Sequence, residues 1–281
     1  HRNLLFTVAY EILGSAADAE DVLQETWMRW DRVDRAEVRD PRSYLVRAVT
    51  RQALNRMRTQ ARRREDYVGA WLPEPLLTSP DVAGDVELAE SVSMAMLAVL
   101  ETLHPVERAV FVLREVFATP YDEIASATDR SPAAVRQIAH RAREHVTARR
   151  PRVAVTREEH EQVLERFLEA VRLGDVDALL DVLAPDVVVI ADGGGVVPAA
   201  RRPIRGAERV ARAVARGFGT TQIDVAAEWI NGAVGALLRH DGELVGAISV
   251  CVSDGRISHV YAIGNPHKLA RLETAAQLTR S

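Results

Sequence analysis

Apolar residues recur at helical spacing through most of the first 150 positions of the chain. The first stripe ends near Gly14, the second runs to Trp30, and Pro41 opens a third segment with the same period. The pattern returns from about Leu88 to Leu103, which predicts one helix there, and a further helix is predicted to start at Pro105. We therefore predict all-helical structure over residues 1 to about 64 and again over 88–150.

The stretch between these segments has a different composition. Residues 65–90 hold three prolines and two glycines, so they cannot form a continuous helix. The apolar residues Trp71, Leu72, Leu76 and Leu77 are costly to leave in water. We expect an extended linker that lies docked along a surface.

Residues 121–150 predict two short helices joined by a turn. Ser131 followed by Pro132 is a strong start signal for the second helix. Its expected outward side chains are Arg136, Gln137, His140, Arg141 and Glu144. Arg and Gln in the first turns of a capped helix suit a DNA recognition helix, because they can pair bidentately with guanine and adenine edges. The alternative is an ordinary helical hairpin with a solvated basic face.

The pattern changes again after Pro151. Helices are predicted over about 156–173, 176–183 and 207–218, and strands over about 187–190, 222–229, 233–240, 244–252 and 256–263. Asp241-Gly242 and Asp254-Gly255 are hairpin turn signals. Helices followed by an antiparallel meander indicate an α+β domain, a curved sheet wrapped around a helix. The predicted fold class is thus two all-α domains followed by an α+β domain.

Composition excludes several classes of protein. The 281 residues carry a net charge of -4, so any surface for a polyanion must be local. Cys251 is the only cysteine, which excludes an intrachain disulfide framework and fits a cytoplasmic protein. No apolar run approaches the length of a membrane span, and no secretory signal pattern opens the chain.

Charge is segregated within the first helical segment. Acidic residues without any basic one run from Glu11 to Glu25, whereas eight arginines without any acid lie between Arg42 and Arg64. This predicts an acidic face and a basic face. Eight uncompensated arginines repel one another unless a polyanion neutralises them, so the pattern favours a nucleic-acid partner over a merely solvated surface.

Three of these stretches together resemble a bacterial RNA polymerase sigma factor of the extracytoplasmic-function class. They are DAEDVLQETWMRW at 18–30, DPRSYLVRAVTRQALNRMR at 40–58 and the hairpin at 121–150. The resemblance implies that the acidic helix docks on core RNA polymerase, and its expected contact residues are Asp18, Glu20, Asp21, Gln24 and Glu25. It also implies that the loop and basic helix from about 34 to 64 hold the minus-ten promoter element, and that the hairpin binds the minus-thirty-five element. The expected DNA-binding residues are Arg42, Arg47, Arg51, Arg56, Arg58, Ser131, Arg136, Gln137, His140, Arg141 and Arg143.

The last part of the chain resembles the SnoaL-like, nuclear-transport-factor-like cone fold, which marks the sigma-J type of this class. Three motifs carry that likeness: Trp71-Leu72-Pro73-Glu74-Pro75, Asp192-Gly193-Gly194-Gly195 and Asn265-Pro266-His267-Lys268-Leu269. Val196 and His267 depart from it, because the group commonly has lysine and aspartate there. The resemblance implies a regulatory extension that takes the place of a separate anti-sigma factor. We expect the 192–195 loop and a helical tail over 265–278 to contact the linker at 71–75.

The resulting domain prediction has four parts: sigma region 2 at 1–65, a linker at 66–90, sigma region 4 at 91–150, and a SnoaL-like regulatory domain at 156–281. Core RNA polymerase and promoter DNA are the expected partners, and no cofactor, metal or membrane contact is expected. One alternative is a DNA-binding regulator that works without polymerase, and another is a sensor whose cone holds a small molecule. A third is cyclase-like or isomerase-like acid–base chemistry at Asp192, His240, His259 and Tyr261. We expect no catalysis, because no spacing among these residues defines a site geometry.

Overall fold

The computed structural model describes residues 1–151, 155–218, 223–272 and 274–280. The chain divides into two compact units, each assembled from separate segments. The helical unit comprises His1–Asp66, Thr78–Arg150 and Ala276–Ser281, and the sheet unit comprises Tyr67–Leu77 and Pro151–Ala275. Residues 67–77 of the predicted linker therefore belong to the sheet unit, whereas residues 78–90 belong to the helical unit.

The helical unit begins with a bundle in which three helices pack against one another. Their bounds are α1 (Arg2–Leu13), α2 (Ala16–Trp30) and α3 (Pro41–Glu65), with a short 3-10 turn η1 (Arg35–Glu37) before α3. Gly14 ends α1 in the left-handed region, and the Ser15 side chain caps α2 by accepting a hydrogen bond from the Asp18 amide. The helices predicted from periodicity over residues 1–64 are confirmed.

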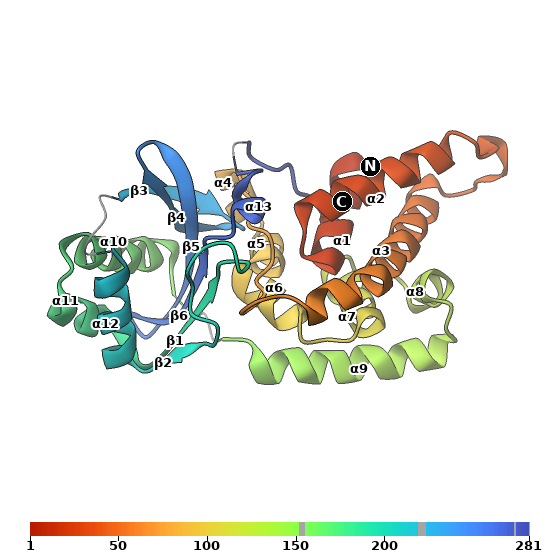
Figure 1. The fold of residues 1–281 in the computed structure, drawn as a ribbon. Coiled ribbons are helices and arrows are strands. Elements are labelled where there is room, and N and C mark those ends of the chain that lie inside the picture. Colours follow the sequence, from red (N-terminus) through yellow and green to blue (C-terminus); the bar gives the residue numbers. More distant parts are fainter. Residues whose placement is uncertain (152–154, 219–222, 273, 281) are drawn as a thin grey trace. The chain divides into compact units, whose positions relative to one another are not determined.

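The second part of the helical unit contains shorter helices (Figure 1). They are α4 (Pro80–Gly84), α5 (Val86–Val92), α6 (Met94–Leu100), α7 (Pro105–Phe111), the π-helix η2 (Val112–Val116), α8 (Tyr121–Thr128) and α9 (Pro132–Arg149). The single helix predicted from Leu88 to Leu103 is wrong. It breaks at Ser93, whose hydroxyl caps α6 through the Met96 amide.

Helices α8 and α9 form the predicted helix-turn-helix. Asp129 adopts the left-handed region at φ 57° and turns the chain, and the Ser131 hydroxyl then accepts a hydrogen bond from the Ala134 amide to cap α9. The buried side of α9 is made by Val135, Ala139, Ala142 and Val146. The cap signal and the apolar period of this hairpin are both confirmed.

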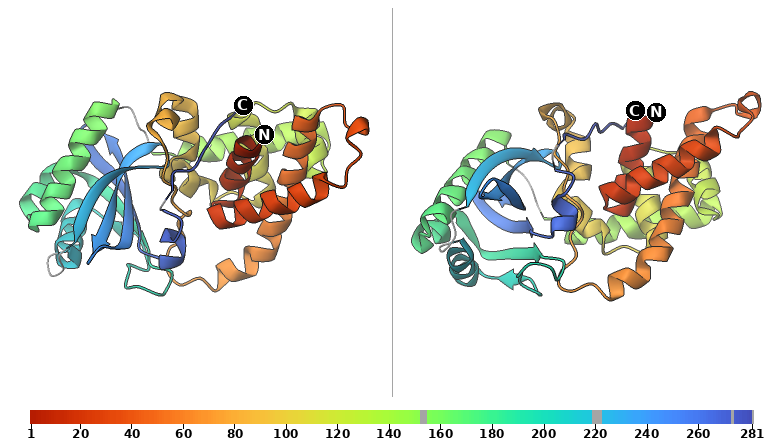
Figure 2. Two further views of the ribbon diagram at one scale, coloured as in Figure 1. Left: turned by 90° about the horizontal axis from the view of Figure 1, so that it is seen from above. Right: turned by 45° about the horizontal axis from the view of Figure 1, so that its top comes forward.

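The sheet unit is a curved six-stranded sheet with three helices on one face (Figures 1 and 2). The helices are α10 (Arg157–Leu173), α11 (Val176–Val182) and α12 (Ala207–Phe218). The strands are β1 (Leu183–Asp192), β2 (Ile204–Arg205), β3 (Asp224–Ile230), β4 (Ala233–His240), β5 (Glu243–Ser253) and β6 (Arg256–Ile263).

The strand order is β2-β1-β6-β5-β4-β3. Strands β3 to β6 form the predicted antiparallel meander, and the Asp241-Gly242 turn has both residues at positive φ, 51° and 82°, as the hairpin signal requires. Strand β1 pairs parallel to β6, which the sequence pattern did not predict. Gln222, where the first meander strand was predicted to begin, lies outside the described residues. The concave face is filled by side chains such as Leu164, Phe167 and Val250, which pack α10–α12 on the sheet.

The predicted C-terminal helix is much shorter than expected. Helix α13 (Pro266–Leu269) begins at the Asn265 cap as predicted, but it ends at Leu269 rather than continuing to Leu278. The reason is tertiary, because Leu278 packs into the helical unit and the Thr279 amide donates to Thr7 Oγ1 there. An extended segment makes these contacts, and they outweigh the weak helical preference of the segment.

Candidate functional site

The acidic helix α2 pairs most of its carboxylates within the helical unit. Arg56 of α3 donates to Asp18 at 2.9 Å and to Asp21 at 2.5 Å, and Arg2 donates to Glu20 at 2.8 Å. Gln24 is exposed and Glu25 is partly exposed. The same helix leaves Trp27 66% and Met28 52% exposed, which is unusual for large apolar side chains and typical of a docking surface.

The basic helix α3 is partly compensated by these carboxylates. Arg56 is committed to α2, and Arg58 donates to Asn55 Oδ1. Arg51 donates to the Ser126 carbonyl at 2.7 Å and Arg47 to the Ser126 hydroxyl at 3.3 Å, whereas Arg42 is exposed at the start of α3. The expectation of wholly uncompensated arginines is therefore wrong, because helices α2 and α3 lie side by side. The side chains of residues 61–65 lie outside the described part.

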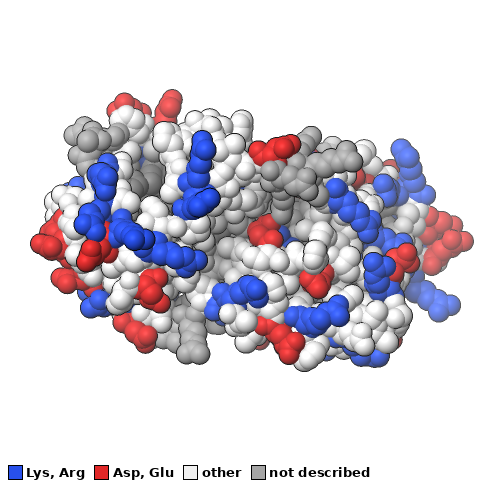
Figure 3. All heavy atoms as spheres, turned by 60° about the horizontal axis from the view of Figure 1, so that its bottom comes forward, with Lys and Arg blue, Asp and Glu red and all other residues white. Residues whose placement is uncertain are grey.

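Acidic and basic side chains are interspersed on the face of the molecule drawn in Figure 3, rather than gathered into one continuous basic surface. On α9, Arg136, Gln137, His140 and Arg141 are exposed, as predicted. Arg143 is also exposed but makes a two-point ion pair with Glu115. The guanidinium of Arg136 lies 5.6 Å from the ring centroid of Tyr121, the first residue of α8. Two arginines of α9, Arg136 and Arg143, therefore have side-chain partners within the helical unit.

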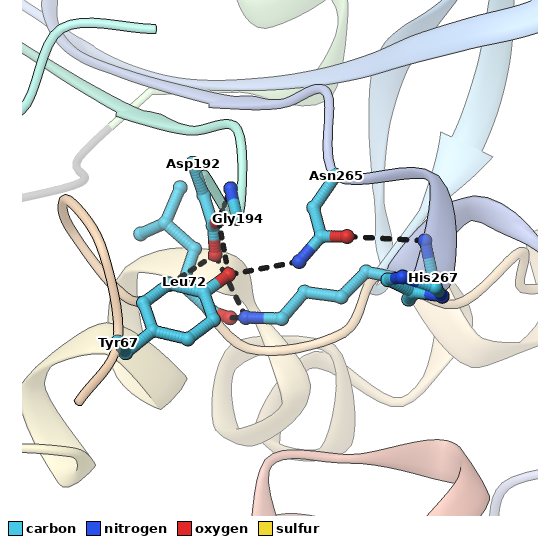
Figure 4. A network of polar contacts seen from close by, with 7 residues as sticks. Tyr67, Leu72, Asp192, Gly194, Asn265 and His267 are labelled. Carbon is cyan, nitrogen blue, oxygen red and sulfur yellow. Dashed lines mark hydrogen bonds and ion pairs between the residues drawn. The ribbon is translucent and has the colours of Figure 1, made fainter. Parts of the chain in front are cut away.

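The sheet unit holds a polar network that fastens the linker (Figure 4). At its centre, Lys268 Nζ lies 2.7 Å from Asp192 Oδ2, and the two side chains are 8% and 0% exposed. Asp192 stands at the end of β1, and Lys268 lies in α13. Of the loop and the 265–278 tail that were predicted to contact the linker at 71–75, Asp192 and Lys268 do so, through Trp71 and Leu72.

Two linker backbone groups complete the network. The Leu72 amide donates to Asp192 Oδ2 at 2.9 Å, and the Leu72 carbonyl accepts a hydrogen bond from Lys268 Nζ. The ammonium group also lies 3.4 Å from the ring centroid of Trp71. One linker residue is thus held through both of its backbone groups by a buried ion pair, and the neighbouring indole covers the cation.

Tyr67 contributes to the same network although no sequence pattern singled it out. Its hydroxyl donates to Asp192 Oδ1 and accepts a hydrogen bond from Asn265 Nδ2 at 2.8 Å. Burial, reinforced by the neighbouring carboxylate, raises the pKa of Tyr67, so the phenol stays protonated and able to donate. The sequence feature that could have indicated this role is the position of Tyr67, an aromatic residue shortly before the Trp71–Pro75 motif.

The triple glycine follows Asp192 because side chains do not fit there. Gly194 has φ 63°, and a Cβ on it would lie 2.3 Å from Asn265 Nδ2. A Cβ on Gly193 would lie 2.3 Å from the Val197 carbonyl oxygen. The Gly194 amide donates to Asp192 Oδ1 at 3.0 Å, so the turn also helps to orient the carboxylate.

The linker is further attached at the edge of the sheet. Leu76 and Asn231 exchange hydrogen bonds: the Leu76 amide donates to Asn231 Oδ1 and the Asn231 amide donates to the Leu76 carbonyl, both at 2.9 Å. Leu77 forms an antiparallel bridge with Ile230, the last residue of β3. Linker residues from Tyr67 to Leu77 are therefore an integral part of the sheet unit.

The four residues considered for acid–base chemistry do not gather around one cavity. Asp192 is committed to Lys268 and the linker, and His240 lies at the β4 hairpin beside Asp241. His259 and Tyr261 stack on neighbouring positions of β6, and burial lowers the pKa of His259. Among the residues that the structure describes, no three acidic, histidine or cysteine side chains are grouped to hold a metal ion.

No helix in the described part of the chain is long and apolar enough to cross a membrane.

Two family models match the helical unit: Sigma-70 region 2 over residues 1–63 and Sigma-70 region 4 over residues 93–146. The chain is 38% identical to the ECF RNA polymerase sigma factor SigJ of Mycobacterium tuberculosis, over 95% of this chain and 90% of that protein. It is 32% identical to the probable ECF sigma factor SigI of the same species, over 96% of this chain and 92% of that protein.

The crystal structure of the M. tuberculosis sigma factor SigJ superposes on this chain with a TM-score of 0.77. The match has 34% sequence identity and covers 97% of this chain and 96% of that chain. The similarity therefore extends through both sigma regions, the linker and the C-terminal mixed α/β domain.

Proposed function

The chain belongs to the extracytoplasmic-function RNA polymerase sigma factors, and on that premise we propose that its C-terminal SnoaL-like domain regulates it by holding the linker between regions 2 and 4. A sigma factor binds core RNA polymerase and directs promoter recognition and the initiation of transcription. The regulatory domain would act from within the chain, in place of a separate anti-sigma protein.

The ion pair between Asp192 and Lys268 is the observation that carries this proposal. Both charges are buried, and together they bind both backbone groups of Leu72. Releasing the linker leaves the carboxylate without the Leu72 and Tyr67 donors, and a buried charge that loses its partners is strongly destabilised. Linker and sheet domain are therefore held together cooperatively. We call this attachment of Leu72 by Asp192 and Lys268 the linker latch, and cooperative release is the property that a regulatory contact needs.

The surfaces for polymerase and promoter are proposed on the helical unit. We infer that Gln24, Trp27 and Met28 on the exposed side of α2 contact core polymerase, alongside the predicted carboxylates. For the minus-ten element we retain Arg42, Arg47, Arg51 and Arg58. Arg56 is the exception, since its ion pairs with α2 support a role in holding the two helices together. Recognition of the minus-thirty-five element is proposed for Arg136, Gln137, His140 and Arg141.

Run-off transcription with purified core polymerase tests the regulatory proposal. The full-length chain is compared with chains that end after residue 150 and after residue 264, and with Lys268→Ala. Arg271→Ala is the matched control, because Arg271 is an exposed basic residue close to Lys268 in sequence. A change in transcript yield with both truncations and Lys268→Ala, but not with Arg271→Ala, supports the latch. Equal yields from all these proteins would refute it.

A small-molecule ligand in the sheet unit is a second proposal with a narrower basis. A groove of about 380 Å³ lies between α10 and strands β3 and β4, and its lining includes the apolar Leu164 and Leu168 and the acidic Glu161, Glu165 and Glu169. A thermal-shift screen of small organic cations against the full-length chain tests it. A rise in the unfolding temperature that Leu168→Arg abolishes would place a ligand in the groove.

A further inference from the structure

The last described residues of the chain do not belong to the SnoaL-like domain that precedes them. Residues 276–280 are part of the helical unit, whereas the segment before them, Pro151–Ala275, is part of the sheet unit. In Figures 1 and 2 the C-terminal end of the chain lies beside its N-terminal end.

Leu278 supplies the apolar part of the attachment. It packs on a separate cluster of buried side chains formed by Val82 of α4 and by Leu88 and Val92 of α5. This cluster is distinct from the main core of the bundle, and α4 and α5 are short helices that cannot bury much surface alone. Leu278 thus covers an apolar patch of the helices that precede region 4.

Arg280 supplies the charged part. Its guanidinium makes a two-point contact with Asp85, at 2.8 and 3.1 Å, and a further ion pair with Glu87. Asp85 also caps α5 by accepting a hydrogen bond from the Leu88 amide at 3.1 Å. Burial alone would raise the pKa of Asp85, but the Leu88 amide and Arg280 outweigh it and hold that pKa below its usual value.

The same segment contacts region 2. The Thr279 amide donates to Thr7 Oγ1 of α1 at 3.1 Å, and Ala276 forms a parallel bridge with Thr78. The segment therefore joins α1 of region 2 to α4 and α5, the helices that lead into region 4.

Regions 2 and 4 are packed together in this structure. Arg51 and Arg47 of α3 contact Ser126 of α8, and a hollow of about 470 Å³ is lined both by the loop before α3 and by Glu123 and Ser126 of α8. The Arg108 side chain of α7 donates to the Glu11 carbonyl of α1 at 2.8 Å. Helix α8 thus occupies arginines that are expected at promoter DNA.

This packing cannot persist on a promoter. The two elements are centred about 25 base pairs apart, which is ~85 Å of duplex at ~3.4 Å per base pair. In the packed arrangement α3 contacts α8 directly. Helix α9, which follows α8, has 18 residues and spans only about 27 Å, so it cannot bridge that separation. Region 4 must therefore move away from region 2 before both elements can be bound.

We propose that the segment Ala276–Arg280 is an intramolecular peptide ligand of the sigma helices, and we call it the strap. It connects α1 to α4 and α5 and thereby favours the closed arrangement, in which regions 2 and 4 pack against each other. The surface that it covers takes a peptide with a leucine, packed on Val82, Leu88 and Val92, and two positions later an arginine paired with Asp85. The strap acts within the helical unit and goes beyond the proposed linker latch, because its residues make none of the contacts of Asp192 or Lys268.

The test uses full-length chains that carry Leu278→Ser or Arg280→Ser. Gln277→Ser is the matched control, since Gln277 lies in the same segment and is exposed. Hydrogen exchange at the amides of residues 86–92 reports strap release, and the affinity for core polymerase reports opening. We expect faster exchange and about three- to tenfold tighter polymerase binding for the two strap variants, equivalent to ~0.7–1.4 kcal/mol. The control is expected to match the unmodified chain.

A peptide added in trans keeps the proposal testable if a variant fails to fold. A chain that ends after Ala275 lacks the strap and should therefore also bind core polymerase more tightly than the full-length chain. It should bind a synthetic peptide with the sequence of residues 275–280, and this peptide should lower its polymerase affinity again. The same peptide with glutamate in place of arginine should not. Unchanged exchange and affinity in both strap variants, or no effect of the peptide, would overturn the proposal. If only the proposed regulation through Asp192 and Lys268 is wrong, Lys268→Ala will leave the transcript yield unchanged, while Leu278→Ser and Arg280→Ser will still show faster exchange and tighter polymerase binding.

Discussion

Lys268, the only lysine of the chain, places its ammonium group 2.7 Å from the carboxylate of Asp192 in a buried environment. The two residues lie 76 positions apart, and the linker residue that they jointly hold is a further 120 positions before Asp192. The other cations of the chain are arginines. A compact ammonium group suits a site where one cation meets a carboxylate, a carbonyl and the face of an indole ring.

Replacing Lys268 with methionine is expected to destabilise the sheet unit by ~3–5 kcal/mol, because Asp192 then remains buried without its counter-ion. The double variant Lys268→Met with Asp192→Asn should recover part of this loss, since no unpaired charge remains. Urea unfolding together with hydrogen exchange at residues 67–77 measures both effects. Equal stability of the single variant and the unmodified chain would contradict the importance of the ion pair.

Alanine at Gly194 should cost more than alanine at Gly174, although both glycines have nearly the same positive φ, 63° and 65°. The left-handed conformation alone costs an alanine about 1–2 kcal/mol. A Cβ at Gly194 also collides with Asn265, whereas a Cβ at Gly174 meets nothing within 4 Å. Thermal unfolding gives the comparison. If both variants lose the same stability, the close approach of the loop to Asn265 is not essential.

Arg141→Ala is expected to lower promoter affinity by ~1–3 kcal/mol and to relax selectivity at one base pair of the minus-thirty-five element, if this exposed side chain contacts a base edge. Arg143→Ala should have a smaller effect on selectivity, because Glu115 already engages that guanidinium. Holoenzyme binding to a panel of single-base promoter variants, at fixed salt, separates the two. A uniform loss over all promoters would show that Arg141 contacts phosphate only.

The stability of the helical unit is expected to fall as pH rises from about 5 to about 8. Glu11 is fully buried in α1, and this burial raises the pKa of its carboxyl to about 8, although the Ser91 hydroxyl and the charges of Arg108 and Arg280 act in the opposite direction. The folded unit therefore keeps a proton that the unfolded chain releases, so the free energy of unfolding decreases by up to ~1.4 kcal/mol per pH unit.

The variant Glu11→Gln should flatten this part of the pH profile, because glutamine does not ionise and its side-chain oxygen can still accept the hydrogen bond from Ser91. Urea unfolding at several pH values provides the measurement. Glu37→Gln is the control, since Glu37 is an exposed carboxylate of the same unit. A Glu11→Gln profile that still falls between pH 5 and 8 would assign the dependence to another group.

Much of the local structure followed from short-range pattern. The cap at Ser131, the left-handed end of α1 at Gly14 and the Asp241-Gly242 turn each depend on a few neighbouring residues. Helix α12 and strands β4 and β6 have the predicted bounds, because their apolar period is regular and turn residues flank them. The motifs that carried the family resemblance are equally local, and the similarity to SigJ confirms that family.

Contacts between residues far apart in the sequence could not be predicted from the sequence pattern. Arg56 was expected at DNA, but α2 places Asp18 and Asp21 beside it, and charge counting along the chain cannot show which helices are neighbours. Tyr67 entered the site through partners 125 and 198 positions away. The helix after Asn265 was predicted too long, because the binding of Leu278 and Arg280 to the helical unit is not visible in their own neighbourhood.

The amino-acid sequence by itself determined most of the helices, the meander, many of the caps and turns, and the family to which the chain belongs, since these depend on periodicity and on contacts between near neighbours. Only the tertiary structure decided which charges are neutralised, that the linker is held by Asp192 and Lys268, and that the last residues join the sigma helices. Those outcomes depend on groups brought together from distant positions, where burial and electrostatic pairing, rather than local preference, set the free energy.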